Sequence, residues 1–271
     1  GSNTAMGNNA LAANTTADNN TAFGRSALAL NTAAGNTAVG YAALDANTTG
    51  GANTAVGTNC LTANTTANYN TAIGDSALAV STTGASNTAL GTYALVSNTT
   101  ASNNTAVGYS ALFANTTGAG NVAVGYGSLD ANTTASNNTA VGLNAMGSNT
   151  TGTNNTAVGK GAMATGSTFG YNTAVGTDAL TADTTGDYNT AVGWTAMDAQ
   201  TTGHFNTAVG GNSLGTQTTG SFATAVGYNA LALTVTAGQC VAVGALASAA
   251  HTSGADTVAV GYKALNANTT G

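Results

Sequence analysis

The sequence predicts an all-β protein of the β-solenoid class, in which the chain winds through coils that stack on one another. Three observations predict it. A repeat with a period of 17 fills the chain, Gly, Asn and Thr hold fixed places that do not suit a helix, and two short alternating stretches lie between turn residues. We therefore expect one repeat array over residues 1–271, with sixteen coils and no second domain.

The period is set by a glycine. It stands at Gly7 and Gly24, then at Gly40, and from there it recurs with a constant period of 17 as far as Gly261. The step from Gly24 to Gly40 is shorter by one. The consensus unit is Asn-Thr-Ala-Val-Gly-x-x-Ala-Leu-x-x-Asn-Thr-Thr-Gly-x-x. With stacked strands ~4.8 Å apart, sixteen coils would make a rod of roughly 75 Å.

The Asn-Thr-Ala-Val-Gly stretch is expected to be the first strand of each coil. Its Thr becomes Val at Val122 and in two other coils, and its Val place is apolar in all sixteen. We therefore expect Thr54 and Val56 to point inward. Asn53 and Ala55 would then point outward, because side chains alternate along a strand.

The second stretch is read in the same way from the place of Leu44, which is Leu or Met in fifteen of sixteen coils. Counting in steps of two predicts that Leu44, Ala46 and Thr48 point inward. Asn47 and Thr49 are then expected to point outward, and to repeat as a regular Asn-x-Thr array.

The Ala of the first strand is Ala in all sixteen coils. An outward position in water would vary, so either the coil leaves no room there or another chain packs against it. We favour close packing between identical chains. The candidate packing residues are Ala38, Ala55, Ala72, Ala89, Ala106 and Ala123.

The Asn that begins the first strand is kept in thirteen coils and is replaced by Ala223, Cys240 and Thr257 in the last three. Stacked Asn side chains can hydrogen-bond along a column. We expect such a ladder, and expect the last three coils to be the least regular.

The composition argues against several classes of function. Charged residues make up 4% of the chain, with three Lys and Arg, nine Asp and Glu and two His, and the net charge is −6. A nucleic-acid partner would need a basic surface. The apolar runs are far shorter than the ~18 residues of a membrane span. We expect no catalysis, no cofactor and no metal.

One column superficially resembles a catalytic triad. Asp187, His204 and Ser221 are each one period apart and should stack on adjacent coils. The same loop column also holds Gly51 and Thr153. Because geometry rather than a list of residues defines a triad, we reject catalysis at this column.

The acidic residues concentrate at Asp178, Asp183, Asp187 and Asp198. The Gly-Gly-x-Gly-x-Asp repeat of calcium-binding β-rolls is absent. We therefore expect solvated surface carboxylates there, and a surface role for His251.

The two cysteines lie in different columns, Cys60 in a small Ala place and Cys240 in the place of the Asn ladder. Ten to eleven coils at ~4.8 Å each would separate them by about 50 Å, so they cannot form a disulfide within one chain.

Aromatic residues gather after the Gly and before the Asn of the first strand. We expect them to cover turns, with a stacking surface for glycans or a partner as the alternative. Asn-Thr-Thr also matches a glycosylation acceptor, but coils this close could not all carry sugar, and we interpret these sites as structural.

The Asn-Thr-Ala-Val-Gly stretch resembles the Asn-Ser-Val-Ala-Ile-Gly motif in the head domains of YadA-like trimeric autotransporter adhesins. It also resembles the NTAVG and NTTG arrays of bacterial surface proteins and phage tail fibres. The resemblance covers all sixteen coils and implies a left-handed β-roll trimer displayed outside the cell or virion. The period of 17 is longer than the unit of those heads, so a single-chain solenoid stays open.

Our first hypothesis is a non-enzymatic, extracellular structural protein, a segment of a longer fibre in a surface adhesin or phage tail fibre. It would act as a rigid spacer and as a contact surface for a host receptor or glycan. The expected partner is a second copy of the chain, in a trimer or a lateral fibre.

The alternative is an ice-binding solenoid that uses the outward Asn-x-Thr array. Its regular threonine file is Thr49, Thr66, Thr83, Thr100, Thr117, Thr134 and Thr151. The neighbouring rank of Asn rather than Thr counts against this alternative.

Overall fold

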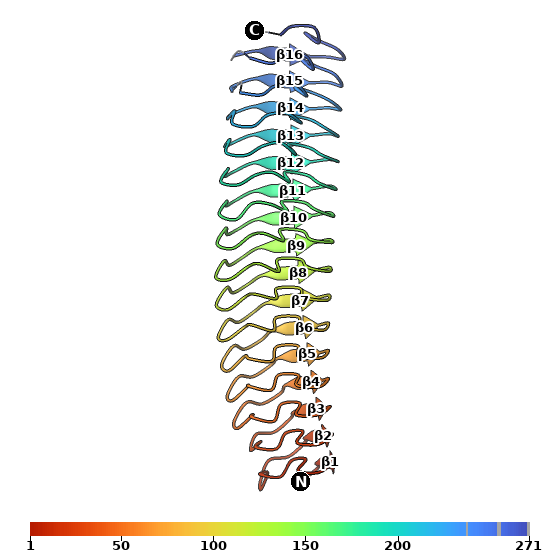
Figure 1. The fold of residues 1–271 in the computed structure, drawn as a ribbon, viewed down its shortest axis with the longest axis vertical. Helices are drawn as coiled ribbons and strands as arrows, with labels where there is room; N and C mark the ends of the chain where they lie inside the picture. Colours follow the sequence, from red (N-terminus) through yellow and green to blue (C-terminus); the bar gives the residue numbers. More distant parts are fainter. Residues whose placement is uncertain (237, 254–255, 270–271) are drawn as a thin grey trace. The chain divides into compact units, whose positions relative to one another are not determined.

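The computed structural model describes residues 1–236, 238–253 and 256–269 (Figure 1). Over these residues the protein is all-β, with sixteen strands of three residues each and no helix. The predicted β-solenoid class is confirmed. We name each coil after its strand, so that coil 11 is the circuit that begins at the residue before β11.

The chain divides into two compact units, Gly1–Asn137 and Asn138–Gly271. The first unit contains β1 (Thr4–Met6), β2 (Thr21–Phe23), β3 (Thr37–Val39), β4 (Thr54–Val56), β5 (Thr71–Ile73), β6 (Thr88–Leu90), β7 (Thr105–Val107) and β8 (Val122–Val124). The second contains β9 (Thr139–Val141), β10 (Thr156–Val158), β11 (Thr173–Val175), β12 (Thr190–Val192), β13 (Thr207–Val209), β14 (Thr224–Val226), β15 (Val241–Val243) and β16 (Val258–Val260).

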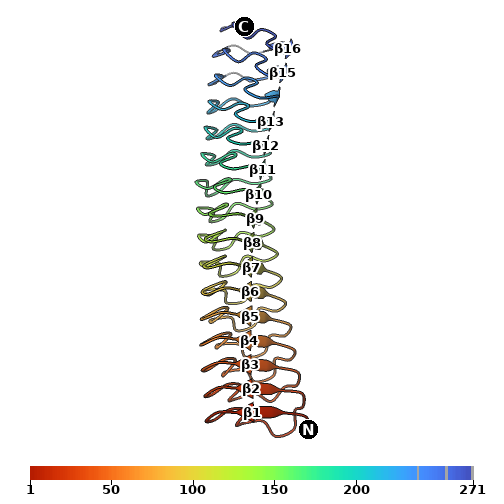
Figure 2. The same ribbon diagram turned by 90° about the vertical axis from the view of Figure 1, so that its right-hand side faces the viewer.

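Within each unit the strands pair in parallel and in sequence order, so that they form one file along the solenoid (Figure 2). The partners are one full period apart, as in Thr54↔Thr71 and Thr156↔Thr173. Between β2 and β3 the offset is one shorter, with Thr21 opposite Thr37. Asn31 Nδ2 donates to the carbonyl of Ala33, two positions later in the chain, whereas Asn47 Nδ2 donates to the carbonyl of Gly50, three positions later. The residue that this coil lacks is therefore the outward Thr.

The second stretch of each coil is a turn and not a strand, so the expectation of two alternating strands is wrong. Leu61 has a φ of 53°, and the equivalent residue of every other coil also lies in the left-handed region. Such a backbone costs ~1 kcal/mol or more for a residue with a side chain. Burial of the leucine offsets the cost, since Leu61 is fully buried.

The strand faces are opposite to the expected ones. Ala55 is fully buried, whereas Thr54 and Val56 lie at the surface and are partly exposed. The packing residues named above, Ala38, Ala55, Ala72, Ala89, Ala106 and Ala123, are all 0% exposed in the single chain. The prediction that they contact another chain is therefore wrong. The interior of so short a coil is narrow, and Ala is what fits.

The prediction for the second stretch is confirmed in part. Leu44 is buried and Thr49 is exposed, as expected. Asn47 is 0% exposed, so its outward placement is wrong, and Ala46 and Thr48 are half-buried at the surface. Because this stretch is a turn, counting in steps of two does not apply to it.

Candidate functional site

A buried ladder runs along the Asn that precedes each strand, here called the first Asn column. The backbone N–H of Asn53 donates to Asn36 Oδ1 at 2.9 Å, and Asn53 Nδ2 donates to the Ala67 carbonyl at 2.9 Å. The next coil repeats both bonds at Asn70. The expected ladder exists, but it lies inside the coil, where each side chain bonds the backbone of its neighbour.

The last three coils lose this ladder and still keep their strands in register. Thr224 pairs with Val241, and Val241 pairs with Val258, so each partner is again one period on. The prediction that these coils are the least regular is therefore wrong for their strands.

The Asn of Asn-Thr-Thr forms a second Asn column inside the coil. Asn64 Nδ2 donates to Asn47 Oδ1 at 2.8 Å, and Asn132 Nδ2 donates to Asn115 Oδ1 at 2.8 Å. All four side chains are 0% exposed. A glycosylating enzyme cannot reach them in the folded protein, in keeping with a structural interpretation of these acceptor sequences.

The two Thr that follow have different roles. The first one bonds the next coil: Thr48 Oγ1 donates to the Thr65 carbonyl at 2.9 Å, and Thr116 Oγ1 to the Thr133 carbonyl at 3.0 Å. The second one is exposed, as predicted, at Thr49, Thr66, Thr83, Thr100, Thr117, Thr134 and Thr151. Because the neighbouring Asn are buried, this part of each coil shows a file of Thr at the surface and no Asn-x-Thr array.

The outer face of the strands carries two further files, which the sequence reasoning placed inside. One is Thr, as at Thr105, and the other is apolar, as at Val175 and Leu90, which are 37% and 45% exposed. Neither file has a charged residue in any of the sixteen coils. We call these two files the sheet face.

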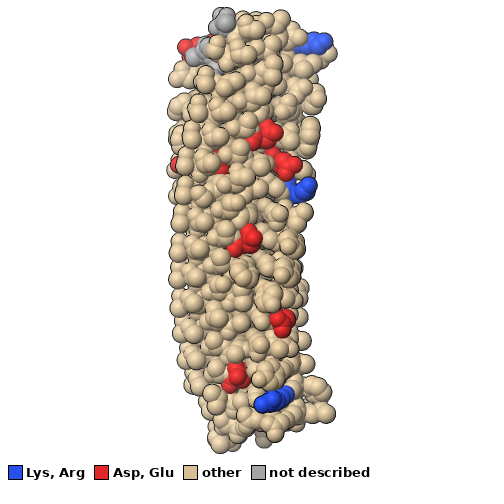
Figure 3. Space-filling view, in the orientation of Figure 1, with Lys and Arg blue, Asp and Glu red and all other residues tan. Residues whose placement is uncertain are grey.

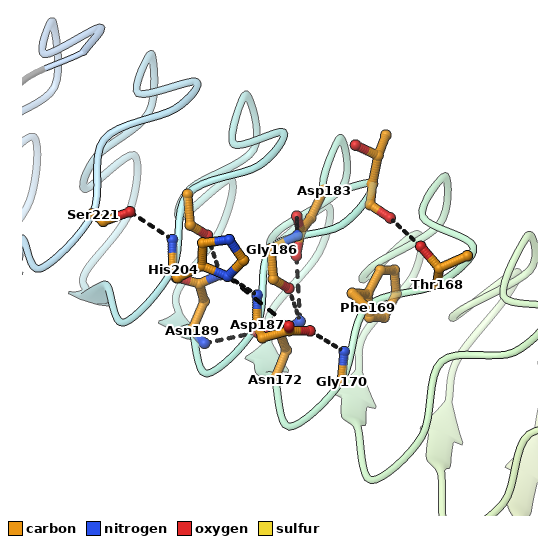
Figure 4. A network of polar contacts seen from close by, with 12 residues as sticks. Thr168, Phe169, Gly170, Asn172, Asp183, Gly186, Asp187, Asn189, His204 and Ser221 are labelled. Carbon is orange, nitrogen blue, oxygen red and sulfur yellow. Dashed lines mark hydrogen bonds and ion pairs between the residues drawn. The ribbon is translucent and has the colours of Figure 1, made fainter.

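The polar column of Asp187, His204 and Ser221 lies in coils 11–13 (Figure 4). The Gly170 N–H donates to Asp187 Oδ1 at 2.6 Å, the Asp187 N–H to His204 Nδ1 at 2.9 Å, and the His204 N–H to Ser221 Oγ at 3.0 Å. Each side chain thus accepts a backbone N–H from the preceding coil.

This connectivity is not that of a Ser-His-Asp triad, in which the His links the carboxylate to the Ser hydroxyl. The Ser221 hydroxyl bonds the backbone of His204 and not its ring. His204 Nδ1 accepts from the Asp187 backbone and lies 4.0 Å from Asp187 Oδ2. The column serves to satisfy backbone donors of adjacent coils.

Asp183 contradicts the expected solvated acidic surface. It takes an Asn place in the second Asn column and is 0% exposed. Its Oδ1 accepts the Gly186 N–H at 2.8 Å, and its Oδ2 accepts from Asn172 Nδ2 at 3.3 Å. Burial raises the pKa of this carboxyl to about 8, and the nearby Asp187 charge adds to the rise. The signal in the sequence was a carboxylate in a column of amides.

The coil before Asp183 carries a paired substitution that the sequence reasoning missed. Gly166 replaces the column Asn, and three positions later Phe169 stands where most coils have Gly or Ala. The Phe169 ring occupies the space that a Gly166 side chain would need, and it is fully buried. The ring therefore fills the place of the missing amide.

His251 and both cysteines are buried. His251 is 0% exposed in the second Asn column, so its expected surface role is wrong. Its Nε2 lies 3.9 Å from Cys240 Sγ. Burial raises the pKa of Cys60 to about 12, which keeps the thiol protonated. The two cysteines are not joined by a disulfide.

An aromatic stack runs along coils 10–13. Successive ring centroids of Tyr171, Tyr188, Phe205 and Phe222 lie 4.9, 5.0 and 5.3 Å apart, with interplanar angles of 8° or less. The rings are at least half exposed. Because Tyr188 and Phe205 have a ring neighbour on both sides, their faces are not open for a sugar to stack on.

Charged side chains are few and scattered on the face shown in Figure 3. Among the described residues, no group of three or more His, Cys, Asp or Glu could hold a metal ion. Within the same residues no helix is long and apolar enough to span a membrane.

The chain was also compared with known proteins. No protein-family model matches it, and no curated protein gives a significant match.

Proposed function

We propose that the protein is a non-enzymatic, extracellular structural element, a stiff fibre segment of a cell surface or virion. The observation that carries the proposal is the set of hydrogen-bond ladders between successive coils. The first Asn column and the first Thr of Asn-Thr-Thr form them in both units, and the second Asn column adds bonds in the first unit. They add side-chain bonds to the backbone pairing at every step from one coil to the next.

The energetics favour a mechanical role. A hydrogen bond contributes about 1 kcal/mol net, and coil 4 makes three buried side-chain bonds with coil 3, two from Asn53 to Asn36 and one from Asn64 to Asn47. In repeat proteins these nearest-neighbour contributions sum along the array. The solenoid can therefore become longer and remain stiff without a wide hydrophobic core.

Forced unfolding of single molecules tests this function. We expect high resistance followed by release of whole coils, each adding about 58 Å of contour at ~3.4 Å per residue. Extension at low force without steps would contradict the proposal. A matched pair of variants, Asn115→Ala in the ladder and Thr117→Ala on the surface, should differ, with only the first lowering the force.

Association of identical chains is part of the same proposal, and the sheet face supports it. An uncharged face with a file of exposed or partly exposed apolar side chains is typical of an interaction surface. Light scattering should give a multiple of 25.8 kDa. Val107→Lys should lower the mass, whereas Thr117→Lys on the turn should not; a monomer in the unmodified protein would contradict the association. A host receptor or glycan remains the expected outer partner.

Ice binding is a second candidate, and the two outward files of the sheet face favour it. Thr and Val ranks repeat on adjacent strands without any charge, and the Thr file of the turns adds a third rank. Thermal hysteresis tests this function. Loss of hysteresis in Thr105→Lys would assign the sheet face, and loss in Thr117→Lys would assign the turn file. An unmodified protein without hysteresis would contradict ice binding.

A further inference from the structure

We propose that Asp183 is a pH-sensitive fastener of coil 11, which holds the turn closed as a neutral acid and releases it when the proton leaves. The proposal starts from the bonds that an ordinary member of the second Asn column makes. Asn149 Oδ1 accepts the Gly152 N–H at 3.1 Å, and Asn149 Nδ2 donates to the Gly152 carbonyl at 3.0 Å. The amide thus closes the turn with one acceptor and one donor.

Asp183 reproduces one half of that pair. Its Oδ1 accepts the Gly186 N–H at 2.8 Å, as Asn149 Oδ1 does for Gly152. Its Oδ2 takes the place of the amide nitrogen, whose partner in the Asn coils is a carbonyl oxygen. A protonated Oδ2 can donate to that carbonyl, whereas an ionised Oδ2 would place a charge against an acceptor.

Within coil 11 the carboxyl accepts from the N–H groups of Gly186 and Thr184 and from Asn172 Nδ2, and the adjacent coils add little to stabilise the ionised form. Coil 10 presents Gly166 and Phe169 to this column and contributes no charge from either residue. Coil 12 presents Gln200, whose buried amide atoms make no hydrogen bond. Asn172 Nδ2 is shared between Asp183 Oδ2 and the Gly186 carbonyl.

The charges nearby act in the same direction. Asp187, on the same turn, is the charged group that acts on Asp183, and it has the same sign. His204 of coil 12 faces Asp187, with Nδ1 4.0 Å from Asp187 Oδ2. Asp198 of coil 12 is itself half-buried, and burial raises the pKa of its carboxyl. The pKa of Asp183, about 8, lies where mildly alkaline water removes the proton.

The turn that would open also carries contacts between coils. The N–H of Thr184 donates to the Thr201 carbonyl at 2.9 Å, and Thr184 Oγ1 donates to the same carbonyl at 2.8 Å. Opening would break this link between coils 11 and 12. It would also release Asp187 from the Gly170 N–H and disturb the stack at Tyr188.

Hydrogen exchange of the full chain at pH 7 and pH 9.5, corrected for intrinsic rates, tests the proposal. We expect the turn at residues 183–188 to lose at least tenfold in protection at the higher pH. The equivalent turn at residues 115–120, closed by Asn115, should keep its protection and serves as the internal reference. Equal behaviour of the two turns would overturn the proposal.

Two variants sharpen the test. Asp183→Asn restores the column residue, so it should fold and keep the turn protected at both pH values; the same alkaline loss in this variant would overturn the proposal. Asp187→Asn removes the neighbouring like charge and keeps a side-chain acceptor. Removing that charge makes ionisation of Asp183 easier, so opening should move to a lower pH. Asp75→Asn, an exposed change of equal charge in the first unit, should leave the exchange of residues 183–188 unchanged.

Discussion

The second Asn column differs between the two units although the backbone around it is the same. In the first unit it holds Asn in seven coils and Ser81 in one. In the second it holds Asn149, Gly166, Asp183, Gln200, Gln217, Thr234, His251 and Asn268. The strands pair one period apart in both units. The winding is therefore set by other columns, and this one adjusts the stability of single coils.

A second contrast concerns the loop column of His204. In the first unit a backbone N–H of this column donates to a polar side chain of the next coil at Gly51, Ala85 and Ala119. These donors are two coils apart, so the bonds join the coils in pairs. In the second unit such bonds run unbroken from Gly170 through Asp187 and His204. These bonds on three successive coils add contacts beside the altered interior.

The largest expected effect falls on what the units share. Gly108 and Gly193 have φ values of 135° and 140°, and a Cβ on either would lie 2.5 Å from the carbonyl oxygen of the next coil's Gly. Gly108→Ala and Gly193→Ala should each cost more than about 4 kcal/mol or prevent folding. Thermal unfolding checks this, with Gly211→Ala as a control whose Cβ would come no closer than 3.5 Å to a neighbouring atom, a Tyr228 ring carbon. Near-normal stability of either variant would show that the Gly column does not set the winding.

The next effect is the pH dependence of stability, which should separate the units. The pKa of Asp183 is raised from 3.8 to about 8 in the folded state. Its stabilising contribution is therefore fully present below pH ~4 and is lost as the pH rises through 8. Over this range the loss amounts to a few kcal/mol, at ~1.4 kcal/mol per pKa unit. Denaturant titrations at pH 5 and 9 should show the fall, and Asp183→Asn should abolish it.

A smaller effect, a gain in stability, is expected at Gln200, whose side chain is longer than the Asn that this column usually holds. Both amide atoms of the buried Gln200 lack a hydrogen-bond partner. Gln200→Asn should shorten the side chain to the column length and stabilise the protein by about 1–2 kcal/mol. The reverse change in the first unit, Asn115→Gln, should destabilise by a similar amount. Opposite signs in chemical denaturation are the test, and equal signs would refute the interpretation.

The smallest effect is expected within the first unit, at its one interruption. Ser81 Oγ and Asn64 Oδ1 are buried without partners. Ser81→Asn should restore the ladder and add about 1 kcal/mol. Thr83→Ala, on the exposed file of the same coil, should change stability by less than about 0.5 kcal/mol. A destabilising Ser81→Asn would mean that the column has no room for the amide.

Much of the fold could be predicted from the repeat, but the direction in which the side chains of the strand point could not. Alternation along the first strand was predicted correctly and placed in the wrong phase. The place of Ala55 is Ala in all sixteen coils, which we interpreted as an outward contact between chains or a tight bend of the coil, and only the packing shows that this place lies in the interior. The turn at Leu61 could not be predicted because left-handed leucine is rare, and its cost is met only by burial.

The candidate site was less accessible to sequence reasoning. The column of Asp187, His204 and Ser221 was located correctly from the period, but its bonds to backbone N–H groups depend on where each coil rests on the last. Asp183 was expected at the surface as one of a group of solvated carboxylates, and His251 was expected there because it replaces an Asn that was predicted to point outward. Both residues lie in the second Asn column, which is buried, and their polar contacts come from other parts of the same coil, Gly186 and Asn172 for Asp183 and Cys240 for His251.

The sequence by itself determined the period, the class of fold and the stacking of like residues. These follow from spacing, since each residue lies over its equivalent in the previous repeat. Only the tertiary structure decided which residues face inward and which groups they bond. A coil of this length closes through turns with left-handed residues. Its interior is narrow and holds the side chains of Ala, Leu and Asn, whereas the Thr and Val of the strand lie at the surface.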